Sequence, residues 1–259
     1  MVNTSIKDDP IKVKFYDPIE KAEKYLKLLF WITVICSFAV PLCNRKSFPN
    51  IYNKLQIVFC LTVLLLSILD LFVRFYLKPR ADDMRVKDFL SHSYEISLNH
   101  NQTVNYYNNN EIKPIRKLAA QLLENSMHSK STTLEMAKKL RLISLVYVVI
   151  FGITIINRST DLEIISIAAQ IVFGQQIITS IIRIEWMRVR FERVFDDMSS
   201  LFQLNPIEKT FEIKTLEGLT KYETTKANGG ILLSNKIFEL NNQKVSNEWN
   251  QLKLNLNIL

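Results

Sequence analysis

The sequence is poor in glycine and proline, with five glycines and seven prolines among 259 residues. Five scattered glycines provide no glycine-rich loop of the kind that holds phosphate in many nucleotide-binding enzymes. The β-branched residues do not alternate with polar ones, as they would in the strands of a barrel. These shortages argue against a β-barrel and favour long helices.

Cysteine is also scarce, and its placement excludes two familiar scaffolds. Cys36, Cys43 and Cys60 lie in or beside apolar runs. They have neither the even number of a disulfide framework nor the spacing of a zinc site. We expect them to be free thiols buried in a membrane.

Four long apolar segments are present, and each is suited to cross a bilayer as a helix. They are Leu28–Cys43, Leu55–Leu77, Leu142–Ile156 and Leu162–Ile182. The first and third fall short of the roughly 30 Å hydrocarbon core, so the flanking Lys27 and Arg141 would extend to the headgroups. The alternative is a soluble all-helical protein with unusually apolar core helices.

The connections between these segments predict the topology. Short links join the first segment to the second and the third to the fourth, and the long polar stretches hold most of the lysines and arginines, which give a net charge of +8. The positive-inside rule then places both termini and the middle stretch in the cytoplasm. The expected fold is an all-α integral membrane protein with two transmembrane hairpins and a helical cytoplasmic domain. Its parts are a cytoplasmic N-terminal segment (1–27), hairpin 1 (28–77), a cytoplasmic helical insert (78–141), hairpin 2 (142–183) and cytoplasmic C-terminal helices (184–259).

The cytoplasmic stretches are themselves predicted to be helical. A helix is expected over Asp82–Leu98, and another from Pro114 directly into the third span. Asn205-Pro206 predicts a cap and first-turn proline for the next helix, which Gly229-Gly230 separates from the last one. The last helix has an apolar stripe that we expect to pack on its own domain: Ile237, Val245, Trp249, Leu252 and Leu256.

No catalytic pattern emerges from the polar residues. The three histidines, His92, His100 and His128, form no His-x-x-x-His pair, so neither a metal site nor a cofactor is expected. Asp70 and Arg74 are spaced i,i+4 and predict a mutually neutralising pair at the membrane edge. We therefore do not expect an enzyme.

The fourth apolar segment carries a polar stripe that needs an explanation. Within an arc of about 140° at 100° per residue lie Ser166, Gln170, Phe173, Gln176, Ser180 and Arg183. The stripe would line an aqueous pore if several copies assemble, or it would hydrogen-bond to neighbouring helices. Gln175 and Thr179 lie off the stripe and suit the second role.

The basic cytoplasmic stretches predict a nucleic-acid or nucleotide ligand, with cations for phosphates and tyrosines on which bases could stack. The candidate residues are Tyr106, Tyr107, Arg116, Lys117, Lys130, Arg188, Arg190, Arg193, Lys221, Tyr222 and Lys226. Juxtamembrane arginines also serve topology and headgroup contact, which is the alternative for the arginines after the fourth segment.

Three stretches carry a resemblance to a known group of proteins. They are RADDMRVKDFL (Arg80–Leu90), TVNYYNNNEIKPIRKLAAQLLENSMHS (Thr103–Ser129) and YETTKANGGILLSNKIFELNNQKVSNEW (Tyr222–Trp249). With the two-hairpin layout, they resemble the four-transmembrane pore-forming effectors encoded beside nucleotidyltransferases in bacterial anti-phage loci. The SMODS-associated four-transmembrane effectors of CBASS-like systems are one such group, and the Hailong-type effector is similar in plan.

The resemblance implies a homo-oligomeric channel in the bacterial inner membrane, and we expect a tetramer. A partner nucleotidyltransferase would make the signal, a nucleotide or single-stranded DNA oligomer, and the effector would respond by permeabilising the membrane, with growth arrest or death. The resemblance fits both a signal that opens the channel and a signal that keeps it closed. Two alternatives remain: a non-conducting membrane scaffold that recruits a partner through its cytoplasmic helices, and a small transporter.

Overall fold

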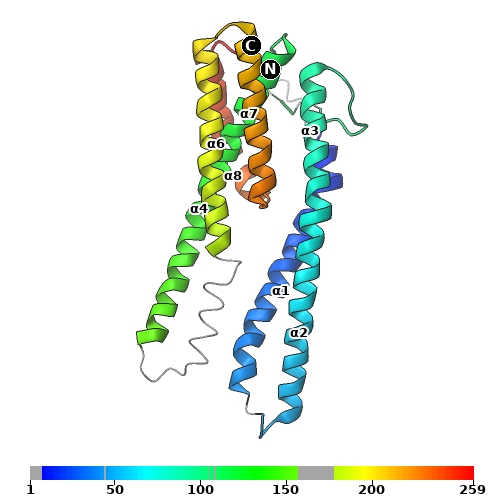
Figure 1. Cartoon of the computed structure of the whole chain (residues 1–259), viewed down its shortest axis with the longest axis vertical. Helices are drawn as coiled ribbons and strands as arrows, with labels where there is room; N and C mark the ends of the chain where they lie inside the picture. Colours follow the sequence, from blue (N-terminus) through cyan, green and yellow to red (C-terminus); the bar gives the residue numbers. More distant parts are fainter. Residues whose placement is uncertain (1–7, 44, 105, 108, 157–177) are drawn as a thin grey trace. The chain divides into compact units, whose positions relative to one another are not determined.

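The structure is a computed structural model that describes residues 8–43, 45–104, 106–107, 109–156 and 178–259. These residues form long helices and no strand (Figure 1), apart from an isolated antiparallel bridge between Asp8 and Val104. The expectation of an all-helical chain is therefore confirmed. The first four residues of the polar stripe, Ser166 to Gln176, lie outside the described residues.

The chain divides into two compact units, which we name the helical body and the apolar unit. The helical body consists of Met1–Ile11, Asp82–Arg141 and Thr179–Leu259. The apolar unit consists of Lys12–Ala81 and Leu142–Ile178. Most of the insert and most of the C-terminal segment therefore belong to the same unit.

The apolar unit contains two packed helices, α1 (Asp17–Leu42) and α2 (Pro49–Phe72). Pro18 and Pro49 lie in the first turns of these helices, where a missing N–H costs no hydrogen bond. A π-helical turn, η1 (Lys12–Tyr16), precedes α1, and another, η2 (Val73–Leu77), follows α2. Asp70 and Arg74 form the predicted i,i+4 pair, 3.8 Å apart.

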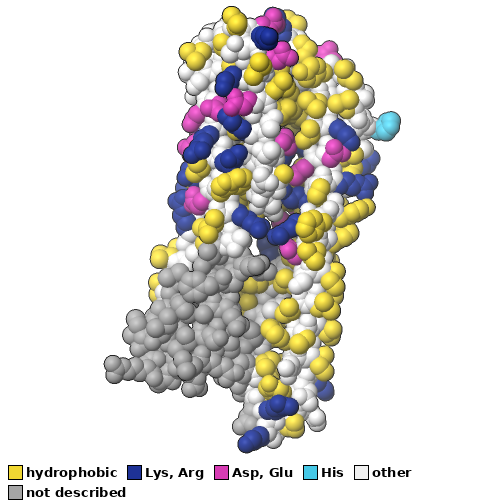
Figure 2. Space-filling model, in the orientation of Figure 1, with side chains coloured by type: hydrophobic (Ala, Val, Ile, Leu, Met, Phe, Trp, Pro, Cys, Tyr) yellow, Lys and Arg dark blue, Asp and Glu magenta, His cyan; other side chains and the backbone are white. Residues whose placement is uncertain are grey.

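One helix in the described part of the chain is long and apolar enough to cross a membrane. It is the continuous run Pro49–Tyr94, made of α2, η2 and α3 (Lys78–Tyr94). Only 11% of its apolar window is buried within the chain. Figure 2 shows hydrophobic side chains spread over the outer face of α1 and α2. In a soluble protein, a helix this apolar would be expected to bury most of these side chains.

The helical body is built mainly from α3, α4 (Pro114–Ile156), α6 (Ile178–Leu204), α7 (Glu208–Gly229) and α8 (Asn235–Asn255). Helix α4 confirms the prediction of one helix from Pro114 into the third apolar segment. Helices α6 and α7 run antiparallel, because the Phe202 ring meets Phe211 near one end and Met187 packs against Gly229 near the other.

The core of the body is formed by apolar side chains from α3, α4, α6, α7 and α8. Trp249 is fully buried, and Leu118, Leu122, Met187 and Phe191 share its cluster. The stripe predicted on the last helix faces this core: Ile237, Val245, Trp249 and Leu256 are buried, and Leu252 packs against the cluster. That prediction is confirmed.

The two predicted helix boundaries had different outcomes. Gly230 ends α7 in the left-handed conformation, with φ of 64°, as the Gly-Gly pair predicted. The Asn205-Pro206 cap was wrong, because α7 begins at Glu208 with Ile207 before it and no side-chain cap. Asn205 instead adopts φ of 39° directly after α6, a position that favours asparagine or glycine.

Replacing Trp249 by alanine should destabilise the helical body strongly. The side chain is fully buried in the shared core, so its loss should lower the free energy of unfolding by about 3–5 kcal/mol. Urea unfolding of the protein in mild detergent, followed by circular dichroism, measures this. Leu240→Ala on the same helix is the matched control, since Leu240 is 70% exposed and should change stability by less than about 0.5 kcal/mol. Equal effects of the two variants would contradict the assigned core.

Candidate ligand-binding region

The residues predicted to bind a ligand all lie in the helical body, and most of the cations already have protein partners. Figure 2 shows basic and acidic side chains interspersed on the visible face rather than separated into a basic patch. The number of partners that each cation already has decides how readily it could contact a ligand.

Arg116 is the most constrained of them. Its Nε donates to Glu111 Oε2 at 3.2 Å and its Nη1 to Asn205 Oδ1 at 2.8 Å. The guanidinium also lies over the rings of Phe202 and Phe211, at 5.4 and 5.1 Å from their centroids. Charge-assisted hydrogen bonds and cation–π contacts together fix this side chain. Arg116 therefore joins α4 to the α6–α7 turn.

The two lysines of α4 differ from each other. Lys117 pairs with Glu95 at 3.1 Å, and that carboxylate is largely exposed. Lys130 lies over the face of Phe195, with Nζ 3.3 Å from the ring centroid. Burial lowers the pKa of Lys130, against the opposing effect of Asp196. Lys130 is thus partly desolvated, whereas Lys117 is held by one exposed partner.

The arginines of α6 also differ. Arg188 bridges Glu185 and Glu192, each at 3.0 Å, on its own helix. Arg190 donates to Thr225 Oγ1 at 3.1 Å and lies over the Trp186 ring at 4.9 Å. Arg193 is exposed and has no ion-pair partner among the described residues. Arg193 is therefore the one of these three that a ligand would meet without displacing a carboxylate, a hydroxyl or an aromatic ring of the described residues.

The lysines of α7 lie in ion pairs on the surface of the body. Lys221 contacts Asp197 at 3.1 Å and Glu217 at 2.8 Å, and Lys226 contacts Glu223 at 2.7 Å. Lys214 and Lys221 together lower the pKa of Glu217 to about 2. This carboxylate therefore stays charged at any physiological pH.

The three tyrosines lie inside the body rather than on its surface as free stacking platforms. Tyr222 is buried, shares a hydrogen bond of 2.8 Å with Ser129, and has its pKa raised by burial. Tyr107 packs edge-on against Phe89. Tyr106 lies under the Arg85 guanidinium at 4.8 Å. A base could stack on these rings only if the surrounding side chains moved.

Replacing one partner of an exposed ion pair costs little free energy. The predicted ligand-binding cations can therefore be ranked by how exposed their ion pairs are. A surface pair contributes about 0–1 kcal/mol, so a phosphate could replace Glu95 on Lys117 or Asp197 on Lys221 at small cost. Removing Arg116 from its two acceptors and two rings would leave Glu111, which is buried, without its cation. Lys117, Arg193 and Lys221 are therefore the predicted residues best placed for a ligand, and Arg116 serves the fold.

A pocket lies beside Lys221, between the end of α6 and α7. Its volume is about 320 Å³, which is within the lower range for small-molecule sites. Met198, Leu201, Leu204 and Pro206 supply apolar walls. Its other lining residues are Asp197, Ser200, Thr210, Lys214, Glu217, Gly218 and Lys221. The rim combines two lysines with two carboxylates, so it has no net charge to attract an anion.

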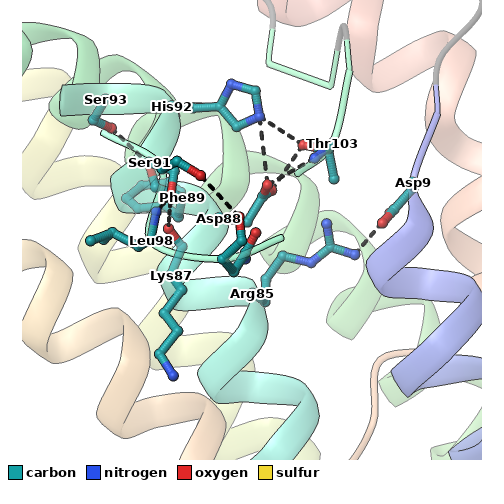
Figure 3. Close-up of polar contacts among 12 residues, drawn as sticks. Asp9, Arg85, Lys87, Asp88, Phe89, Ser91, His92, Ser93, Leu98 and Thr103 are labelled. Atoms are coloured by element: carbon teal, nitrogen blue, oxygen red, sulfur yellow. Dashed lines mark hydrogen bonds and ion pairs between the residues drawn. The ribbon is translucent and has the colours of Figure 1, made fainter. Parts of the chain in front are cut away.

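A buried polar cluster, which sequence patterns did not indicate, holds the loop between α3 and α4 (95–113). Figure 3 shows Asp88 pointing toward Thr103, whose backbone N–H and hydroxyl donate to the two carboxylate oxygens at 2.9 and 2.8 Å. His92 Nε2 lies 2.9 Å from the same hydroxyl. Because that hydroxyl donates to Asp88, the histidine nitrogen must be the donor to it. We name these three residues the loop latch.

The loop latch is a structural arrangement rather than a nucleophile site. Thr103 is buried and its hydroxyl hydrogen is already committed to a carboxylate. A nucleophilic hydroxyl needs a free base and an approach for substrate. Beside the latch, Arg85 contacts Asp9 at 2.8 Å, which ties the chain's N-terminal segment to α3 (Figure 3).

Ser180 and Arg183 are the members of the polar stripe that the structure describes, and both lie in the first turns of α6. Arg183 lies beside the Gly230 turn that ends α7. Within the described ranges, no group of three His, Cys, Asp or Glu side chains is placed to hold a metal ion. The three cysteines are free, with Cys36 buried and Cys60 exposed on α2.

Replacing Asp88 by alanine should release the loop while leaving the body folded. Both donor groups of Thr103 would lose their acceptor, at about 1–3 kcal/mol for each unsatisfied group. Hydrogen exchange of amides in residues 95–113 should accelerate at least about tenfold. Asp83→Ala is the control, because Asp83 forms only an exposed pair with Lys87. Unchanged exchange in the Asp88 variant would show that the latch does not hold the loop.

Comparisons with known proteins give no further identification. No protein-family model, no curated protein and no solved structure matches this chain.

Proposed function

We propose that this chain is a multi-pass membrane effector that assembles into a homo-oligomeric ion channel, whose opening the helical body controls in response to a cytoplasmic ligand. The observation that carries the proposal is helix α4. Its first part supplies the fully buried Leu118, Leu122 and Leu123 to the core of the body, and the same helix continues into an apolar segment ending at Ile156.

Membrane insertion is supported by the exposure of apolar side chains in the apolar unit. Ile57, Leu61 and Leu64 on α2 each expose about half of their surface. Burying one such side chain contributes about 1.5–3 kcal/mol, so lipid or another copy would have to cover this helix. Four spans, with both termini and the helical body in the cytoplasm, fit the apolar segments and the positive-inside rule.

Coupling between ligand and channel follows from chain continuity. Both α4 and α6 pass between the two units, at Arg141 and Thr179, and Arg141 pairs with Glu185 of α6. A ligand that favours one arrangement of these two helices in the body would therefore bias the segments continuous with them. Moving a channel from 1:99 to 99:1 needs about 5.5 kcal/mol of differential binding, summed over its subunits.

The resemblance supplies the class of ligand and the physiological role. A nucleotide or single-stranded DNA oligomer made by a partner nucleotidyltransferase would be the signal, and membrane disruption with growth arrest or death would be the outcome in anti-phage defence. Lys117, Arg193 and Lys221 are the cations best placed to meet it, for the reasons given above.

A non-conducting membrane scaffold is the second candidate, and one observation favours it. Most predicted ligand cations are neutralised by carboxylates of the same body, as Lys221 and Lys226 illustrate. A body with balanced surface charge suits recognition of a protein partner at least as well as recognition of a polyanion. The two candidates differ in whether ions cross the membrane.

Leucine substitution on the polar stripe tests conduction. The variant Gln170→Leu, Gln176→Leu, Ser180→Leu should lower ion flux through reconstituted liposomes at least about tenfold, because an apolar lining excludes water from a narrow pore. Gln175→Leu with Thr179→Leu is the matched control, since these positions lie off the stripe. Flux through both variants equal to that of the parent would refute the pore lining. No flux from the parent, with or without cytosolic extract, would favour the scaffold.

Co-purification tests the ligand class. Protein purified in detergent should carry an absorbance excess at 260 nm that nuclease treatment removes, if the resting state holds an oligonucleotide. High salt should also release it, because phosphate contacts weaken as counterions compete. A clean protein spectrum, together with no binding of added single-stranded DNA at low salt, would contradict a nucleic-acid ligand.

A further inference from the structure

One end of the helical body holds two of the four points at which the chain passes to the apolar unit. At this end, which we name the exit end, α4 leaves the body after Arg141 and α6 enters it at Thr179. Helix α7 finishes here at Gly229, beside Met187, and α8 begins here at Asn235. The backbone N–H of Ser234 lies 3.4 Å from Met136 Sδ, which places the start of α8 against α4.

The exit end carries three basic side chains that lie close together. Lys139 of α4 and Lys236 of α8 are exposed, and Arg183 of α6 is half-buried. None of the three forms an ion pair with any described residue, in contrast to Lys117, Arg188 or Lys226. The local carboxylates Glu135 and Glu185 are already used by Lys138 and Arg141, and Glu239 on α8 accepts a hydrogen bond from Asn235. The exit end therefore has an excess of positive charge that its own acids do not neutralise.

Exposed apolar side chains lie beside these cations. Ile182, next to Arg183, is 63% exposed, and Trp186 one turn later is 37% exposed. The Trp186 ring also carries the Arg190 guanidinium on its face, 4.9 Å away. Ile182 and Arg183 are adjacent on α6 and Trp186 follows within one turn, and such groupings of cations, tryptophan and apolar side chains are common at a bilayer's headgroup layer.

We propose that the exit end of the helical body is a contact surface for anionic phospholipid headgroups, in which Lys139, Arg183 and Lys236 meet the phosphates while Ile182 and Trp186 enter the interface. This inference rests on the membrane placement in the proposed function and adds a lipid requirement to it. The apolar side chains favour a lipid over a free phosphate, which would leave them in water. An anionic lipid would thereby hold α4 near Arg141 and the start of α6 at the interface, where the proposed coupling between body and channel takes place.

The test compares lipid selectivity in two charge-matched variants. The full chain is reconstituted into liposomes of phosphatidylcholine and phosphatidylglycerol, extracted in mild detergent, and the retained lipids are quantified by mass spectrometry. The parent should be enriched in phosphatidylglycerol. Lys139→Gln with Lys236→Gln should lower that enrichment by about fivefold per lysine, since each surface cation contributes about 1 kcal/mol to anionic membrane binding. Arg183 is left in place because it also belongs to the predicted pore stripe.

Lys209→Gln with Lys244→Gln is the control, because it removes the same charge from the start of α7 and from the middle of α8. The enrichment of phosphatidylglycerol should be unchanged in this control, and in the parent it should be unchanged by millimolar inorganic phosphate. Equal enrichment of phosphatidylglycerol in the Lys139→Gln, Lys236→Gln variant and in the control would overturn the proposal. Displacement of phosphatidylglycerol by inorganic phosphate would overturn it too. Extraction of the chain from membranes by alkaline carbonate would instead refute the membrane placement itself, so the two failures are distinguishable.

Discussion

The packing of helix α4 is the constraint on which the remainder of the structure depends. Over 43 residues this helix has to fill the core of the helical body and then present an apolar surface. In its first part, fully buried polar residues such as Gln121 and Thr133 alternate with leucines, and each hydroxyl or amide needs a partner inside the protein. Ser93 supplies one to Gln121 and the Ser129 carbonyl supplies one to Thr133. The first of these bonds joins α3 to α4 and fixes their register more tightly than apolar contacts alone, whereas the second lies within α4.

Charge placement in the body follows from the same constraint. A helix that supplies so many buried side chains to a shared core leaves few positions for unpaired cations, because a buried charge without a partner is costly. Arg116 shows the result, since its two acceptors and two aromatic rings come from segments distant in the sequence. Among the described residues of the body, exposed cations without an ion pair include Lys139 and Lys236 at the exit end, Arg193 on α6 and Lys209 at the start of α7, where solvent or headgroups can neutralise them. The distribution of paired and unpaired cations is thus a guide to where the body meets other molecules.

Local patterns predicted much of the fold and little of the site. The start of α4 at Pro114, the end of α7 at Gly230 and the core position of Trp249 each follow from a short-range rule: proline in a first turn, glycine with positive φ, and a helical stripe. The burial of Asp88 could not be read in this way. Its only local sign is the i,i+4 spacing to His92, and its main partner, Thr103, lies across a loop. Asn205 was misread because the rule for proline competed with the preference of asparagine for a left-handed turn.

Long-range pairing also explains why some of the predicted ligand residues face solvent while others are held by partners inside the body. Basic and aromatic residues attract attention in a sequence whether they face solvent or one another, and only tertiary packing distinguishes them. Tyr222 shows the second case, since its hydroxyl is satisfied by Ser129 in the core. If the channel is a tetramer, the required 5.5 kcal/mol amounts to about 1.4 kcal/mol in each subunit. In the proposed channel, the contacts of a ligand with Lys117 and Lys221 would therefore have to exceed the exposed pairs with Glu95 and Asp197 by about this amount in one state of the channel over the other.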